Sequence, residues 1–133
     1  MSGPDLIALM PFADLCGLVV ETATPDEVAG TMEWAPERCT TGGILHGGAL
    51  MTLADTMGAL CAFQNLPPGA TTATVESKTN FFRPVARGRV RAVTRPLHKG
   101  RAFIVVQTDV LDDQGRRVAQ VTQTQAVIAP APK

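Results

Sequence analysis

The sequence predicts an α+β domain in which a curved antiparallel sheet wraps around one long helix. Two observations support this fold class. Apolar side chains recur at helical spacing in a single segment that begins after Gly47 and Gly48, while most of the remaining chain reads as strands. Because one helix cannot bury its own apolar face, a sheet that curves around it is the economical partner.

The elements follow in order from the N-terminus. Residues 1–16 are expected to form a helical cap that Pro11 interrupts. Strand-like segments at 18–24 and 28–34 flank Pro25-Asp26-Glu27, a sequence suited to a turn. A hairpin is therefore expected before the long helix.

The long helix is expected to have one apolar face and one small, polar face. The apolar face carries Leu50, Leu53, Ala54, Met57, Leu60 and Cys61. The other face carries Thr52, Asp55, Thr56 and Ala59. The Pro-Pro-Gly sequence at 67–69 ends this segment.

Four long strands are expected after the helix, at 71–83, 86–97, 101–111 and 116–128. Phe81 and Phe82 are assigned to the core. The Ala-Pro-rich residues 129–133 are expected to form a frayed tail.

Length and composition fit one domain over residues 1–133. With 45% hydrophobic residues, 18% charged residues and zero net charge, the chain is expected neither to be disordered nor to attract nucleic acid. No apolar run approaches the ~20 residues of a membrane span, and no secretory signal is recognisable, so a cytoplasmic location is expected. Cys16, Cys39 and Cys61 are too widely spaced for a structural metal site and are expected to be reduced, with Cys16 and Cys61 packed.

Asp55 is the single acid of the long helix. Withdrawing a lone carboxylate from water is costly unless it is hydrogen-bonded, paired or protonated, so Asp55 is expected in a polar pocket. Two structural interpretations stay open: a solvated residue on a surface helix, and a buried acid bonded to nearby backbone. Ionisable groups in perturbed environments concentrate at functional sites, which favours a catalytic role.

The start of the helix offers a second candidate group. The Gly47 amide can point at a carbonyl oxygen that gains negative charge during acyl transfer, and glycine permits close approach of a substrate. Asp55 lies eight residues further on, about 12 Å along a helix, so the two cannot touch one small reacting centre. A two-fold dimer in which Gly47 of one subunit faces Asp55 of the other would unite them, and an obligate monomer should be inactive.

Asp55 could act as nucleophile on the carbonyl or as general base on water. The sequence offers no obvious Ser-His-Asp or Cys-His set as an alternative. His46 precedes Gly47 directly, and either a catalytic role or loop positioning and substrate contact fits it.

The zero net charge conceals a basic segment between Ser77 and Thr108 that contains no acid. Eight of the twelve basic residues lie there: Lys78, Arg83, Arg87, Arg89, Arg91, Arg95, Lys99 and Arg101. This favours a polyanionic ligand, although a solvated sheet face is the alternative. Because no nucleic-acid recognition motif appears, a phosphate-bearing acyl carrier such as coenzyme A fits better.

Two stretches, HGGALMTLADTMGAL from His46 and TVESKTNFFRPVARG from Thr74, carry a combination of motifs: His-Gly-Gly, Leu-Ala-Asp and Phe-x-Arg-Pro. Together they resemble the hotdog-fold acyl-CoA thioesterases of the PaaI-like (phenylacetate-pathway) group, within the 4-hydroxybenzoyl-CoA thioesterase superfamily. The resemblance extends over nearly the whole chain, from about residue 17 to residue 128.

The resemblance implies that Asp55 is the catalytic carboxylate and that the Gly47 amide polarises the thioester carbonyl across a dimer interface. Thr74 stands where relatives carry a hydroxyl that helps to orient the attacking water, and His46 belongs to the same constellation. Substrate contacts are expected from Thr40, Gly48, Phe82, Arg83, Pro84, Lys99, Gly100 and Arg101. Thr40 replaces an Asn that is common in relatives. The resemblance implies no metal or cofactor, a homodimer at least, and commonly a homotetramer.

Rival functions fit less well. Dehydratases of the same fold place an acid later in the central helix, whereas the next acid after Asp55 is Glu76. A non-catalytic acyl-CoA sensor is expected to need a further domain, and a plain structural dimer leaves Asp55 unexplained. The predicted function is hydrolysis of an aryl- or medium-chain acyl-CoA, with a non-catalytic acyl-CoA-binding protein as the alternative.

Overall fold

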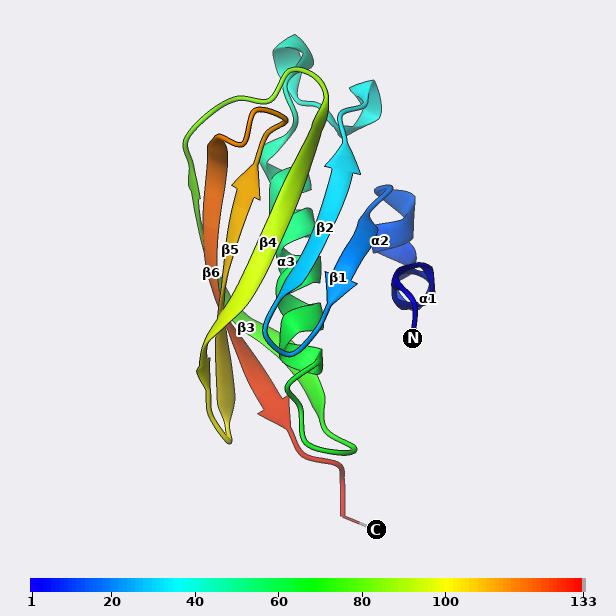
Figure 1. Cartoon of the computed structure of the whole chain (residues 1–133), viewed down its shortest axis with the longest axis vertical. Coiled ribbons are helices and arrows are strands. Elements are labelled where there is room, and N and C mark those ends of the chain that lie inside the picture. Colours follow the sequence, from blue (N-terminus) through cyan, green and yellow to red (C-terminus); the bar gives the residue numbers. More distant parts are fainter. Residues whose placement is uncertain (133) are drawn as a thin grey trace.

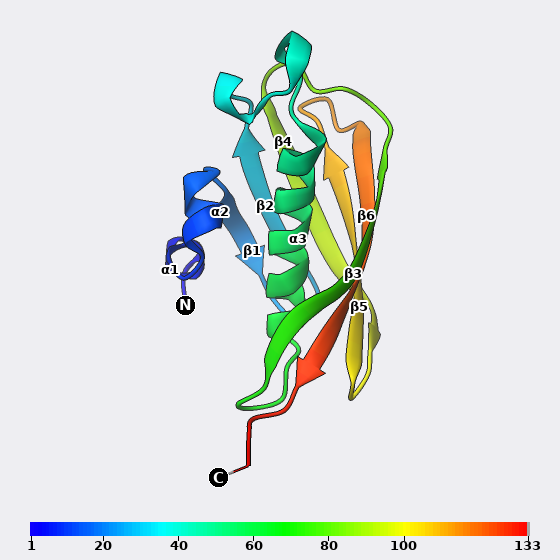
Figure 2. The same ribbon diagram turned by 180° about the vertical axis from the view of Figure 1, so that it is seen from behind.

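In the computed structural model, which describes residues 1–132, helix α3 (Gly47–Phe63) lies against the concave face of a six-stranded antiparallel sheet (Figure 1). The sheet order is β1-β2-β4-β5-β6-β3. The strands span Val19–Ala23 (β1), Val28–Glu33 (β2), Thr71–Phe81 (β3), Arg89–Lys99 (β4), Phe103–Leu111 (β5) and Arg117–Ile128 (β6). The view from behind shows the sheet curving around the helix (Figure 2), so the predicted α+β hotdog architecture is confirmed.

The core lies between α3 and the covered side of the sheet. The helix contributes the fully buried Leu53, Ala54, Met57 and Cys61. The strands present alternate buried side chains, as antiparallel strands with one covered face do. Gly30 of β2 leaves room for this packing, because a Cβ there would lie 2.6 Å from Sδ of Met57.

The N-terminal cap consists of two short helices rather than one interrupted helix. Helix α1 (Gly3–Ala8) begins with a capping box formed by Ser2 and Asp5. Helix α2 (Pro11–Leu15) begins at its proline, which is favoured in the first turn of a helix. Helix α1 packs against edge strand β1 (Figure 1).

Some residue-level predictions are wrong. Phe81 and Phe82 were expected in the core but are 51% and 53% exposed, because they lie at the end of edge strand β3 and directly after it. Thr56 was expected on the polar face but is buried, and its hydroxyl donates to the Thr52 carbonyl at 2.7 Å. Residues 129–132 of the expected tail are exposed and irregular, and Lys133 lies outside the described residues.

None of the helices in residues 1–132 is long and apolar enough to cross a membrane.

Strand β3 is unusually exposed for its length. In the part of the chain that the structure describes, it pairs on one side only, with β6. Nine of its eleven residues are exposed, on both faces of the sheet. A register shift between Thr74 and Glu76 marks a β-bulge in this strand. A long edge of this kind is a template for pairing with another chain.

Candidate active site

Asp55 lies midway along α3, and its Oδ1 accepts two side-chain hydrogen bonds. The Thr74 hydroxyl of β3 donates from 2.8 Å, and Nε2 of Gln123 on β6 donates from 2.6 Å. Its other oxygen, Oδ2, has no hydrogen-bond donor among residues 1–132. One oxygen is therefore held by the protein while the other stays open.

The polar pocket expected around Asp55 is open to solvent within a single chain, because this residue is exposed. The interpretation as a buried acid bonded to backbone is wrong, since both of its donors are side chains. Exposure arises because Asp55 lies on an uncovered side of α3, where Met51 and Phe63 are also exposed, next to the uncovered β3. The interpretation of Asp55 as a merely solvated surface residue does not account for its two side-chain hydrogen-bond donors.

Two fully buried glutamines, which the sequence motifs did not single out, lie behind this carboxylate. Gln123 and Gln125 both have 0% exposure. Nε2 of Gln125 donates to the Thr74 hydroxyl oxygen at 2.8 Å, which extends the network one residue further. Their spacing in the sequence could have indicated them. Gln123 and Gln125 follow Val121 at every second residue, so all three lie on the covered side of the strand, where polar side chains are uncommon.

His46 caps the start of α3. Its Nδ1 accepts the Gly48 amide at 2.8 Å, so the neutral ring carries its proton on Nε2. The Gly48 amide is thereby occupied within the chain. The Gly47 amide, in contrast, has no acceptor among residues 1–132, which leaves it as the available donor at the helix start.

A cleft of about 340 Å³ opens at this helix start. It is lined by Ile44, Leu45, Gly47, Leu50, Phe81, Phe82, Arg83, Pro84 and Val85. The structure therefore brings Gly47 together with the predicted substrate residues 82–84. Thr40 is exposed in the loop before the helix. Asp55 does not line this cleft, so one chain keeps the acid apart from the amide donor.

The predicted contact turn at Lys99-Gly100-Arg101 lies at the opposite end of the molecule from the helix start (Figure 2). Gly100 and Arg101 line a cleft of about 660 Å³ together with residues of the loop that follows α3, the end of β6 and the segment after it. The Lys99 ammonium lies 4.0 Å from Asp26. A single chain therefore does not join this turn to residues 82–84.

The basic segment is partly neutralised by the β1–β2 hairpin. Arg91 pairs with Glu21 at 3.1 Å, and Arg95 pairs with Glu27 at 2.6 Å. These pairs fit the alternative of a solvated sheet face rather than a phosphate site. Arg83 and Arg101 form no ion pair within residues 1–132, so they are better placed to bind an anion.

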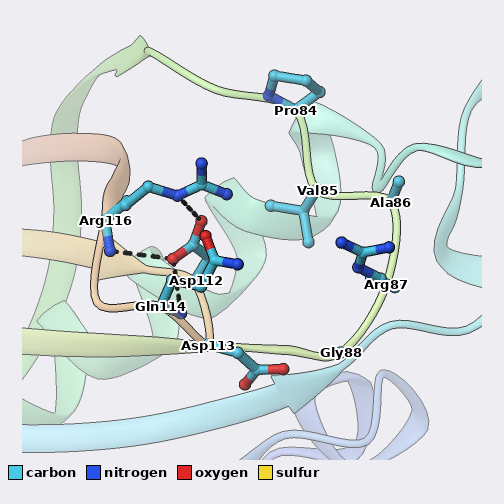
Figure 3. Close-up of a pocket in the computed structure, with 9 residues that line it drawn as sticks. All are labelled: Pro84, Val85, Ala86, Arg87, Gly88, Asp112, Asp113, Gln114 and Arg116. Atoms are coloured by element: carbon cyan, nitrogen blue, oxygen red, sulfur yellow. Dashed lines mark hydrogen bonds and ion pairs between the residues drawn. The ribbon is translucent and has the colours of Figure 1, made fainter.

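A third cleft, of about 400 Å³, lies between the loop at 84–88 and the β5–β6 turn (Figure 3). Its charged lining residues are Arg87, Arg116, Asp112 and Asp113. Arg116 is already engaged with Asp112 at 2.9 Å. Because the opposite charges balance, this cleft shows no preference for an anionic ligand.

Cys61 of α3 does not supply a nucleophile. Its burial in the core raises the pKa of the thiol to about 11. The side chain therefore stays protonated near neutral pH, and a protonated thiol is neither a good nucleophile nor a metal ligand.

Known proteins resemble this chain in both sequence and structure. The family model described as Thioesterase superfamily matches residues 42–119. The chain is 30% identical to the proofreading thioesterase EntH of Cronobacter sakazakii over 112 residues, which cover 84% of this chain and 82% of that protein.

Solved structures agree. A thioesterase from Haemophilus influenzae has a TM-score of 0.93 at 26% identity, with 99% of this chain and 94% of that chain covered. A mutant of the phenylacetic acid degradation protein PaaI from Thermus thermophilus has a TM-score of 0.80 at 28% identity, with 87% and 96% covered. The chain therefore belongs to the thioesterase superfamily and is a PaaI-like hotdog-fold thioester hydrolase.

Proposed function

We propose that the protein hydrolyses an acyl-CoA thioester to the free acid and CoA, in a site shared by two copies of the chain. The observation that supports this most strongly is the Asp55 carboxylate, which has one oxygen held by Thr74 and Gln123 and the other open. An aryl or medium-length acyl group fits the apolar lining of the cleft at the helix start.

The second copy is the proposed cover for the exposed side of the molecule. Strand β3 has an unpaired edge among the described residues, and exposed apolar side chains lie along it and beside it: Met51, Phe63, Val75 and Phe81. Antiparallel pairing of two β3 strands would satisfy the open backbone groups and bury these side chains. It would also shield Asp55 from bulk water.

Antiparallel pairing of the two β3 strands about a two-fold axis also reverses the direction of α3 in the second copy. The partner's helix start can then lie opposite the middle of α3, which places the free Gly47 amide of the partner near Asp55. The same operation brings the turn at 99–101 of one copy toward the end of the molecule that carries residues 82–84 of the other. Dimers of this kind are proposed to pair into tetramers.

In the proposed reaction, Oδ2 of Asp55 removes a proton from water, and the resulting hydroxide adds to the thioester carbonyl carbon. The Gly47 amide of the partner subunit donates to the carbonyl oxygen as it becomes negative. The C–S bond then breaks, and the CoA sulfur leaves and takes up a proton. Water is the only co-reactant in this scheme.

Direct attack by Asp55 is the second route to the same products. It would form an acyl-carboxylate anhydride that water then opens. Label in the Asp55 carboxylate after one turnover in ¹⁸O-labelled water would establish this second route, because label enters that carboxylate only when water attacks the anhydride on the Asp55 side.

Release of free thiol from a panel of acyl-CoAs tests the proposed function. We expect turnover of at least one aryl or medium-chain substrate. Absence of release across the whole panel would contradict an acyl-CoA hydrolase. Tight binding of acyl-CoA without turnover would favour the non-catalytic binding protein.

The proposed phosphate contact at Arg83 predicts a binding defect. Arg83→Ser should raise KM for acyl-CoA about tenfold through loss of one charge-assisted hydrogen bond, with little change in kcat. Arg95→Ser is the matched control, because Arg95 already pairs with Glu27 at 2.6 Å. Equal KM values for the two variants would remove Arg83 from the CoA site.

A further inference from the structure

We propose that Gln123 and Gln125 are positioning residues for thioester hydrolysis: they fix which oxygen of Asp55 reacts. This inference rests on the proposed role of Asp55 as the catalytic carboxylate. Neither glutamine touches the open Oδ2, so each acts through another side chain.

Gln123 holds the acid directly. Only an N–H of its amide can face a carboxylate oxygen at 2.6 Å, which fixes the orientation of the amide group. The side chain is fully buried among the core residues of β6, so it has little freedom to follow Asp55 if the acid turns. Gln123 therefore holds Oδ1 in place and leaves Oδ2 as the reacting oxygen.

Gln125 acts one step further back, through Thr74. A hydroxyl has a single proton. Because the Thr74 oxygen accepts the Gln125 amide at 2.8 Å, its own proton is directed to Asp55. A register shift follows Thr74 and marks a β-bulge. Bulges change the direction of nearby side chains and are common beside functional sites.

One atom of this hydrogen-bond network is buried in a way that is unfavourable for folding stability. The Oε1 atom of Gln123 is buried without a hydrogen-bond partner among the described residues. Room for this atom depends on Gly58, because a Cβ there would collide with Oε1 of Gln123. An apolar side chain would fill the same space without an unpaired oxygen. Stability alone does not account for glutamine here, whereas orientation of Asp55 does.

Three single variants test the proposal: Gln123→Met, Gln125→Met and, as the matched control, Gln120→Met. Methionine keeps the length and shape of glutamine but removes the donor. Gln120 lies on the opposite side of the same strand and also donates to a carboxylate, that of Asp109 at 3.1 Å. Each variant is assayed for kcat, KM and thermal unfolding as the intact assembly, and Gln123→Met is also combined with Asp55→Asn.

We expect Gln123→Met to lower kcat about tenfold with little change in KM, and Gln125→Met to lower it by a smaller factor. Thermal stability should be unchanged or higher, and Gln120→Met should match the wild type. In the Asp55→Asn background, loss of the Gln123 donor should reduce any remaining rate no further.

Three results would overturn the proposal. The first is a wild-type kcat in Gln123→Met, and the second is a loss of kcat that simply follows a loss of stability. The third is the same fractional loss of rate with and without the Asp55 carboxylate. If Asp55→Asn itself retains the wild-type rate, the catalytic role of Asp55 fails, and the positioning role fails with it. If Asp55→Asn is inactive while Gln123→Met is fully active, only the positioning role fails.

Discussion

Replacement of Asp55 by Asn is expected to lower kcat for acyl-CoA hydrolysis by about 10²-fold or more. Asn retains the shape of the side chain and can still accept the hydrogen bonds of Thr74 and Gln123 through its oxygen. It presents an amide nitrogen at the position of Oδ2, however, and this group can neither remove a proton from water nor attack a carbonyl. KM should change much less than kcat, which steady-state kinetics will show.

Asp109→Asn provides the matched control. Asp109 on β5 also accepts a glutamine amide, that of Gln120, and pairs with Arg117 at 3.1 Å. It lies on the other side of the sheet from the helix. We expect wild-type kcat in this variant, and an Asp55→Asn enzyme as active as the Asp109→Asn enzyme would exclude Asp55 from the chemistry.

Replacement of Gly47 by Pro is expected to lower kcat by about 10²- to 10³-fold, the loss typical of removing one oxyanion donor. Proline lacks the backbone N–H, and its fixed φ suits the first position of a helix. His46 already has φ −61° and ψ 136°, a conformation that the residue before proline readily adopts. No hydrogen bond within residues 1–132 is lost, since the Gly47 amide has no acceptor there.

Gly47→Ala separates loss of the amide from added bulk. Both variants place a Cβ about 3.1 Å from the exposed Phe81 ring, but alanine retains the N–H. We expect Gly47→Ala to be far more active than Gly47→Pro at equal thermal stability. Similar rates for the two variants would mean that space at residue 47, rather than its amide, limits the reaction.

Local sequence was sufficient to predict the helix and the strands, and it singled out Asp55 and Gly47 as candidates. Asp55 stands out because a lone acid in an apolar helix is unusual, and Gly47 because glycines before a helix expose amides. Both signals come from residues close together in the chain. The order of strands in the sheet, in contrast, depends on long-range pairing.

Features that depend on this pairing could not be read from the sequence. The ion pairs Arg91–Glu21 and Arg95–Glu27 exist because β4 lies next to the β1–β2 hairpin. Gln123 reaches Asp55 because β6 is covered by α3, and Phe81 is exposed because β3 is an edge strand. In each case, residues distant in the chain determine the surroundings of the side chain. A prediction from apolarity alone therefore places Phe81 wrongly in the core.

The proposed site requires Asp55 of one copy and Gly47 of its partner, and subunit mixing is the decisive experiment. Asp55→Asn and Gly47→Pro chains are unfolded together, refolded in equal amounts and assayed beside each variant refolded alone. Random pairing should restore about a quarter of the wild-type rate, because half of the dimers are mixed and each has one intact site of two. A mixture no more active than the two variants measured separately would contradict a shared site.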